Sequence, residues 1–244
     1  MREIKAPGEN WGQLWVQGAH PSPGQRGKEG WMSDLASLLS GARQRLVRYK
    51  KGQIIFDEGE PSSAVFRVVS GCVRLQINGA DGHRQIVGFL FPGDLFGLCV
   101  DERTSSAGAI GDVELTRYAL DSVLQLSTQS TELTFELIRT INTQFNALAH
   151  QVEHVTHLPA RERVLWFLSG LADRRSGIGA SVPLPMNRRD IGDFLALAPE
   201  TLSRVIKTLQ EQGIVAFRGP RAFTVRIPAL KSLPQPFEQR PAAA

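Results

Sequence analysis

Residues 189–209, RDIGDFLALAPETLSRVIKTL, decide the fold of the C-terminal part of this chain. Apolar side chains recur there at helical spacing in two groups, which are Ile191, Phe194 and Leu195, and then Leu202, Val205, Ile206 and Leu209. Between the groups, Ala196 is small enough for a close crossing of two helices. Pro199 suits the first turn of a helix, because no intrahelical N–H bond is lost there. The pattern predicts two short helices joined by a turn, which is a helix-turn-helix.

The polar side of the second predicted helix carries side chains that suit base recognition. Relative to Glu200, the residues Ser203, Arg204 and Lys207 follow at offsets of 3, 4 and 7, so all four share one face. Arginine forks onto guanine O6 and N7, glutamate accepts from cytosine N4, and serine contacts either base or a thymine methyl. We therefore predict that Glu200, Ser203 and Arg204 read bases in a major groove. The alternative is an amphipathic helix whose charges face water.

Basic residues around this motif favour a polyanionic partner. Residues 158–228 hold 11 Lys and Arg against 6 Asp and Glu, whereas residues 1–157 hold 15 against 17. A hairpin predicted over residues 214–226, around Gly219-Pro220, is interpreted as a wing that grips the DNA backbone. The residues expected at DNA phosphates are Arg188, Arg189, Thr201, Lys207, Arg218 and Arg221. A solvated basic surface is the alternative interpretation of the charge.

Short β-rich segments fill residues 44–120, and glycines separate them. Residues 73–77 alternate apolar and polar side chains, as a half-buried strand does, and Asn78-Gly79 is a strong hairpin signal. Short strands of this kind predict a sandwich or barrel. The predicted fold class is α+β, with an N-terminal β-roll, a long helix and a C-terminal winged helix-turn-helix.

A long helix is predicted over residues 121–157. Apolar residues spaced alternately by 3 and 4 define an a/d seam, which consists of Ile138, Ile141, Phe145, Leu148, Val152 and Val155. Leu133 and Leu137 are expected to widen the same face. The strict spacing favours a homodimer seam over packing against the chain's own barrel. His150, His154 and His157 have a spacing that could hold a metal, but they fall on the far side of the seam and are expected to face solvent.

The expected organisation is a flexible leader at 1–32, the β-roll at 33–120, the dimerisation helix at 121–157, the winged helix-turn-helix at 158–228 and a flexible tail at 229–244. Neither a membrane span nor a secretory signal is predicted, because no apolar run is long enough. Cys72 and Cys99 are too few for a disulfide framework or a four-cysteine metal site. A cytoplasmic protein with buried, inert thiols is therefore expected.

Residues 35–228 resemble the CRP/FNR superfamily of bacterial transcription regulators in the order of their elements, with a β-roll like that of cyclic-nucleotide-binding domains. The string ETLSR at 200–204 is similar to the FNR/FixK branch, in which Glu, Ser and Arg read a TTGAT half-site. The cAMP-receptor branch instead has Arg before the Glu and Gly at the Ser position. The stretch FPGDLFGL at 91–98 is also similar to FixK-type proteins. The resemblance implies a homodimer that binds double-stranded DNA at an inverted repeat near TTGAT-N4-ATCAA, contacts RNA polymerase and acts as an activator.

The resemblance also bears on effectors of the β-roll. Cyclic-nucleotide-binding relatives use a Gly-Glu pair on the ribose, where this chain has Gly97-Leu98, and Arg103-Thr104 follows too closely to serve as their phosphate-binding pair. The expected leader holds no cysteine for an iron–sulfur cluster. By elimination, no cofactor is expected. The alternative is a regulator gated by haem, with His83 and Cys72 as axial ligands, or by another small effector.

Two other functional classes fit the sequence less well. A cupin-type metal oxygenase needs two or three histidines and a glutamate inside the barrel, but residues 44–120 contain only His83. A cyclic-nucleotide-binding or scaffold module without DNA binding leaves the helix-turn-helix unexplained. The sequence therefore predicts a DNA-binding regulator and not an enzyme.

Overall fold

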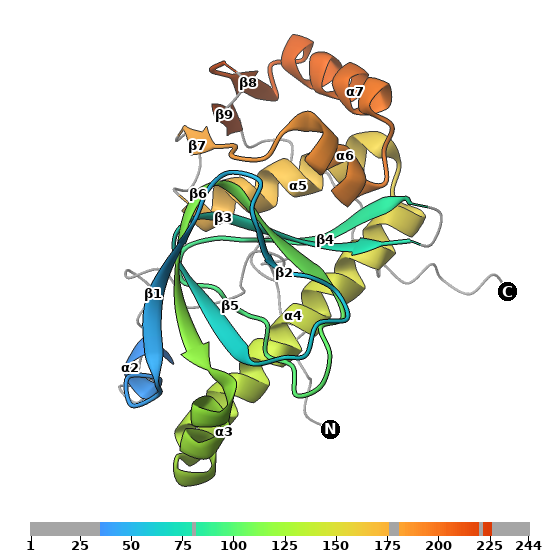
Figure 1. The fold of residues 1–244 in the computed structure, drawn as a ribbon. Coiled ribbons are helices and arrows are strands. Elements are labelled where there is room, and N and C mark those ends of the chain that lie inside the picture. Colours follow the sequence, from blue (N-terminus) through green and yellow to red (C-terminus); the bar gives the residue numbers. More distant parts are fainter. Residues whose placement is uncertain (1–34, 80–81, 176–180, 220–221, 226–244) are drawn as a thin grey trace, which may run out of the picture.

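The computed structural model describes residues 35–79, 82–175, 181–219 and 222–225. The expected leader at 1–32, the expected tail at 229–244 and Arg221 lie outside the described residues. The long helix α4 (Thr131–His157) runs diagonally along the β-roll and connects it to the C-terminal helices (Figure 1). Among the described helices, none is long and apolar enough to span a bilayer.

Antiparallel strands form the N-terminal sheet in the order β1-β6-β3-β4, with β2 beside β6 and β5 beside β3. Their bounds are β1 Gln44–Tyr49, β2 Ile54–Phe56, β3 Ala64–Asn78, β4 Arg84–Leu90, β5 Leu95–Phe96 and β6 Ser106–Ala119. The long pairing of β3 with β6 shifts register between Val68 and Cys72. Gly71 in this irregularity has φ +90°, and a Cβ there would lie 2.5 Å from the Asp112 carbonyl oxygen, so only glycine fits. The β-roll expected from the sequence is confirmed.

An aromatic core fills the roll. Phe56, Phe66 and Phe96 have ring centroids 5.4 to 6.1 Å apart, and all three are buried. β3 and β4 form the hairpin that Asn78-Gly79 predicts, with Asn78 opposite Arg84. This hairpin matters for function because β4 also contacts the C-terminal part.

Two helices, rather than one, cover the span expected as a single helix at 121–157. α3 (Leu120–Gln129) and α4 meet at Ser130, whose backbone is extended with φ −131° and ψ 103°. The Ser130 hydroxyl accepts a hydrogen bond from the Leu133 amide at 3.2 Å and so caps α4. Because the apolar residues before and after Ser130 both keep helical spacing, the sequence does not indicate that the helix is interrupted there.

The first turns of α4 face the roll. Leu133 and Leu137 are buried in one cluster with Leu120 and Val123 of α3 and with residues of the short helix α2 (Leu35–Leu38). The expectation that Leu133 and Leu137 widen the dimer seam is therefore wrong. Periodicity alone could not distinguish two neighbouring apolar faces of one helix.

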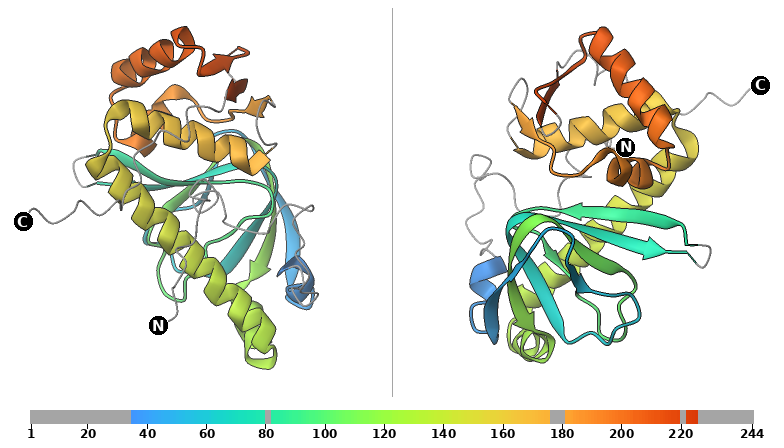
Figure 2. Two further views of the ribbon diagram at one scale, coloured as in Figure 1. Left: turned by 180° about the vertical axis from the view of Figure 1, so that it is seen from behind. Right: turned by 45° about the horizontal axis from the view of Figure 1, so that its top comes forward.

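The C-terminal part contains the expected winged helix-turn-helix. Its elements are α5 Ala160–Arg175, β7 Val182–Pro183, α6 Arg188–Leu195, α7 Pro199–Glu211, β8 Val215–Phe217 and β9 Ala222–Val225. The strands pair in the order β7-β9-β8, and β8 with β9 forms the wing hairpin. One apolar cluster joins α5, α6 and α7 and continues into the roll through Cys72, Ile86, Phe89 and Phe91. The two parts therefore share a core, and α6 lies over β4 (Figure 2).

Candidate nucleic-acid interface

The turn between α6 and α7 depends on two small residues. Ala196 has left-handed backbone with φ 51° and ψ 49°, the only positive φ at a non-glycine residue in the described ranges. Leu197 donates its amide hydrogen to the Gly192 carbonyl oxygen at 3.0 Å, and a Cβ on Gly192 would lie 2.8 Å from the Leu197 carbonyl oxygen. The close approach expected at Ala196 therefore occurs at Gly192, which no pattern in the sequence singles out. Ala196 is exposed and supplies the reversal of direction.

α7 lies at the outer surface of the C-terminal part, away from the roll (Figure 1). Leu202, Ile206 and Leu209 are buried and fix the helix on the core beneath it. The four side chains expected to meet DNA are all exposed: Glu200, Ser203, Arg204 and Lys207. The helix thus presents one polar face, as the spacing predicts, while the DNA contacts themselves stay a prediction.

Most of the described residues expected at phosphates are exposed, but Arg188 has a second role. Arg189, Lys207 and Arg218 are exposed, and Thr201 is half-buried. The Arg188 guanidinium carbon lies 4.7 Å from the centroid of the Phe217 ring of β8. Burial lowers the pKa of Arg188 below its ordinary value. Arg188 therefore links the start of α6 to the wing.

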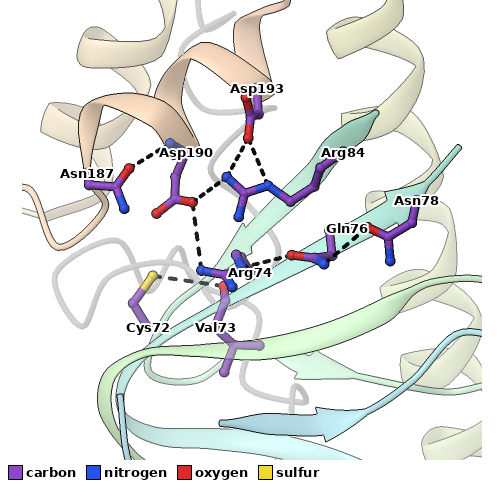
Figure 3. Close-up of polar contacts among 9 residues, drawn as sticks. All are labelled: Cys72, Val73, Arg74, Gln76, Asn78, Arg84, Asn187, Asp190 and Asp193. Atoms are coloured by element: carbon purple, nitrogen blue, oxygen red, sulfur yellow. Dashed lines mark hydrogen bonds and ion pairs between the residues drawn. The ribbon is translucent and has the colours of Figure 1, made fainter. Parts of the chain in front are cut away.

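A set of polar side chains joins α6 to the β-roll and to α4, and no sequence pattern predicts it. We call this set the α6 clamp, and it consists of Arg74, Arg84, Gln151, Asp190 and Asp193. Arg84 of β4 donates to an oxygen of Asp190 at 2.9 Å and to an oxygen of Asp193 at 2.8 Å (Figure 3). Arg84 and Asp190 stand 106 positions apart in the chain, so only the folded structure brings them together.

The a/d seam of α4 is open to solvent. Ile138, Ile141, Phe145, Leu148 and Val152 are 42% to 67% exposed, and Val155 is half-buried. Apolar side chains rarely gather on an exposed surface unless a partner covers them. The seam is therefore uncovered within one chain, and the homodimer expected from the heptad spacing stays a prediction.

The three histidines of α4 do not share a solvated face. His154 is half-buried, and its ring makes an edge-on contact with Trp166 of α5, with centroids 4.3 Å apart. Burial lowers the pKa of His154, and smaller effects come from Glu153, which raises it, and His150, which lowers it. The expectation of solvent exposure is therefore wrong for His154. Across the described part of the chain, no three potential ligand side chains gather as a metal site would require.

Cys72 and Cys99 have different surroundings. Cys72 in β3 is buried, as expected. Cys99 lies in the loop after β5 and is partly exposed, and its thiol donates to the Glu102 carbonyl oxygen at 2.9 Å. The expectation of a buried thiol is therefore wrong for Cys99. His83 is exposed in the β3–β4 loop. Of the two residues considered as haem ligands, His83 therefore lies at the surface and Cys72 lies in the core.

Arg103 occupies the interior of the roll. Its guanidinium donates to the carbonyl oxygen of Ala64 at 2.5 Å and to that of Gly97, and it lies 4.2 Å from the centroid of the Phe56 ring. Burial lowers the pKa of Arg103, although this side chain is satisfied by carbonyl oxygens and an aromatic face. Leu98 packs against the cluster of α2, α3 and α4.

These residues do not fit a cyclic nucleotide. Recognition of the ribose needs an acceptor for its hydroxyl, and Leu98 has none. Recognition of the phosphate needs a cation that can turn toward it, but the Arg103 guanidinium is held by backbone carbonyls. In the described part of the roll, Leu98 and Arg103 therefore do not offer the contacts that a cyclic nucleotide needs.

Comparisons with known proteins agree with this architecture. The model of the cyclic nucleotide-binding domain matches residues 46–130, and that of the Crp-like helix-turn-helix domain matches residues 162–234. The nitrogen fixation regulation protein FixK of Rhizobium meliloti is 32% identical over 80% of this chain and 89% of that protein. The transcriptional activatory protein AadR of Rhodopseudomonas palustris is 32% identical over 69% and 72%. The structure of FixK2 from Bradyrhizobium japonicum is 34% identical, with a TM-score of 0.72 over 75% of this chain and 93% of that chain.

Proposed function

The chain belongs to the CRP/FNR family of transcription regulators, in its FixK-like branch, and from this premise we propose that it activates transcription as a homodimer on an inverted repeat. Proteins of this family are DNA-binding regulators and not enzymes. The proposed site is close to TTGAT-N4-ATCAA, with one α7 in the major groove of each half-site.

One observation carries this proposal: the exposed side of α7 presents Glu200, Ser203 and Arg204 together, while its other side is anchored in the core. A TTGAT half-site contains a single G·C pair. Arg204 can fork onto O6 and N7 of that guanine, and Glu200 can accept from the amino group of the paired cytosine. Ser203 is then left to meet a neighbouring A·T pair, where its Cβ suits a thymine methyl.

Exposed positive side chains on α6, on α7 and in the wing support the proposed phosphate contacts. Arg189, Lys207 and Arg218 are exposed at the start of α6, along α7 and in the wing. Contacts of this kind fix the register of a protein on DNA without reading sequence. Arg188 and Thr201 belong to the same proposed set, as does Arg221 beyond the described residues.

A homodimer formed through the a/d seam would have twofold symmetry, which matches the symmetry of an inverted repeat. Two copies of α7 related by a twofold axis would lie about one DNA turn apart, roughly 34 Å. A dimer seated on DNA in this way would contact RNA polymerase from its outer surfaces. Such a function places the protein in the cytoplasm.

We also propose that DNA binding needs no small effector. The support is Arg103, whose guanidinium takes the interior position where an effector of the roll would need room. Adding cAMP to the purified chain should leave its Tm unchanged, since a ligand stabilises only a fold that binds it. A visible haem absorption band or bound metal in the freshly purified protein would overturn this part of the proposal.

The decisive experiment is selection of binding sites from random duplex DNA with the full chain. We expect enrichment of an inverted repeat with TTGAT-like halves, and a mobility shift that prefers this repeat to a scrambled duplex at moderate salt. Specific complexes of this kind bind at least about a thousandfold more tightly than non-specific ones. Equal binding to repeat and scrambled duplex would overturn the proposal.

A further inference from the structure

Opposite charges balance within the α6 clamp at the boundary between roll and helix-turn-helix. Arg84 forks between Asp190 and Asp193, which lie three positions apart on one side of α6, and Arg74 of β3 reaches Asp190 at 3.7 Å (Figure 3). Asp190 is only 1% exposed. A carboxylate this deeply buried is costly unless it is paired, so its position is tied to the position of Arg84.

The side-chain amide of Gln151 joins helix α4 to this junction between strand β4 and helix α6. Gln151 of α4 is buried and donates to the carbonyl oxygens of Ile86 in β4 and Phe194 in α6, each at 2.9 Å. Hydrogen bonds are directional, unlike apolar contacts, so these two bonds fix orientation as well as distance. Helix α4, strand β4 and helix α6 are therefore held in one arrangement.

This arrangement determines where α7 stands relative to the a/d seam. α6 leads into α7 through the three-residue turn after Leu195, and α4 carries the seam, so the clamp lies on the path between the reading face and the dimer axis. Adding one base pair between half-sites moves them by about 3.4 Å along the duplex and rotates them by about 35°. Only a rigidly placed α7 can distinguish such a change.

We infer that Arg84 is a positioning residue that sets the spacing between the two half-sites which the dimer accepts. The inference rests on the proposed binding of a homodimer to an inverted repeat. The apolar contacts among α5, α6 and α7 do not involve Arg84, so base reading within a half-site does not depend on it. Without Arg84, Asp193 loses its partner in the clamp and Asp190 keeps only the longer contact with Arg74, so hydration of the junction is favoured and α7 samples several positions.

The test compares full-length Arg84→Gln with the parent on duplexes whose half-sites are separated by four base pairs or by one or two more or fewer. The parent should prefer one spacing by about tenfold or more, the size of effect that one wrong base pair has on a specific complex. Arg84→Gln should reduce this preference to less than about threefold while keeping the same base preferences within a half-site. Arg84→Lys, which keeps the charge but loses the fork, should fall between them.

Arg48→Gln is the matched control, because Arg48 pairs with Glu114 at 2.6 Å on the exposed side of the same roll. It should keep the spacing profile of the parent. If Arg84→Gln does not unfold cooperatively, Asp193→Asn removes one arm of the fork at a less buried position and should broaden the profile in the same way. A parent-like profile in a folded Arg84→Gln or Asp193→Asn protein would overturn the inference. A parent that does not bind the repeat at all would instead overturn the proposed function.

Discussion

Leu137 and Ile138 are neighbours on α4, yet Leu137 is 6% exposed and Ile138 is 56% exposed. Successive residues of a helix point about 100° apart, so one side of α4 can serve the roll while the adjacent side serves another surface. Leu137 completes the cluster with α3, and Ile138 begins the open seam. Within one chain, α4 is thus packed on one side and open to solvent on the adjacent side.

A charge in the seam should therefore separate the protomers without unfolding them. Phe145 is the most exposed seam residue, so Phe145→Asp meets water in the monomer but would be desolvated in a dimer. We expect sedimentation at half the parent's mass and weak binding to the inverted repeat. Asn146→Asp adds the same charge at the next, exposed position and should remain dimeric. Equal sedimentation of Phe145→Asp and parent would refute the seam.

Base reading by α7 predicts a local loss of specificity. Arg204→Ala removes the proposed fork onto guanine and should cost about 1–3 kcal/mol at that base pair. The preference at the G·C position should relax while the other positions keep theirs. Binding-site selection with the variant measures this directly, and an unchanged preference at the guanine would show that Arg204 does not read it.

Phosphate binding by Lys207 predicts a different signature. Lys207 is exposed, and its only described ion pair is a 3.8 Å contact with the exposed Glu211, which contributes little. Lys207→Ala should weaken all sequences alike. Each lost phosphate contact reduces the magnitude of the slope of log binding constant against log salt by about 0.9. A dimer loses two such contacts, so the slope should become shallower by about two. A sequence-dependent loss with the parent's salt slope would assign Lys207 to base reading instead.

Local chemistry explains which parts of the fold could be predicted. The two apolar groups around Ala196 and the proline at position 199 are short-range signals, and they predict the helix-turn-helix. The seam follows from heptad spacing in the same way. The α6 clamp could not be predicted, because Arg84 and Asp190 meet only after the hairpin and the C-terminal part dock.

Contacts inside the roll could not be predicted from the sequence either, for the same reason. In the sequence, Arg103 with Thr104 is considered only as a phosphate-binding pair that follows Gly97 too closely. Nothing nearby indicates that carbonyl oxygens from two separate segments receive its guanidinium. His154 differs from its expected solvent exposure because its ring packs against Trp166 on the following helix α5. Cys99 differs for a local reason, since it lies in the loop after β5 and its thiol bonds to Glu102, three positions along the chain.

Arg103 should contribute strongly to stability. Arg103→Ala leaves the carbonyl oxygens of Ala64 and Gly97 without their donor inside the roll. Each unsatisfied buried group costs about 1–3 kcal/mol, so we expect a loss of about 3 kcal/mol in the free energy of unfolding. Urea denaturation measures it as a lower midpoint. Arg45→Ala, at an exposed position of β1, should change stability by less than about 0.5 kcal/mol, and an equal effect of both substitutions would contradict the buried role of Arg103.

His154 should make stability depend on pH. Its pKa in the folded chain lies below the ordinary value of 6.5, chiefly because of burial against Trp166. Well above pH 6.5 the ring is neutral in both the folded and the unfolded chain. As the pH falls below 6.5 the unfolded chain takes up a proton first, so the free energy of unfolding decreases until the pH passes the folded pKa. His154→Gln should flatten this decrease, as measured by urea unfolding between about pH 7.5 and about pH 5. His157→Gln, an exposed histidine one turn later, controls for the loss of a histidine. A parent-like pH dependence in His154→Gln would show that His154 does not titrate differently on folding.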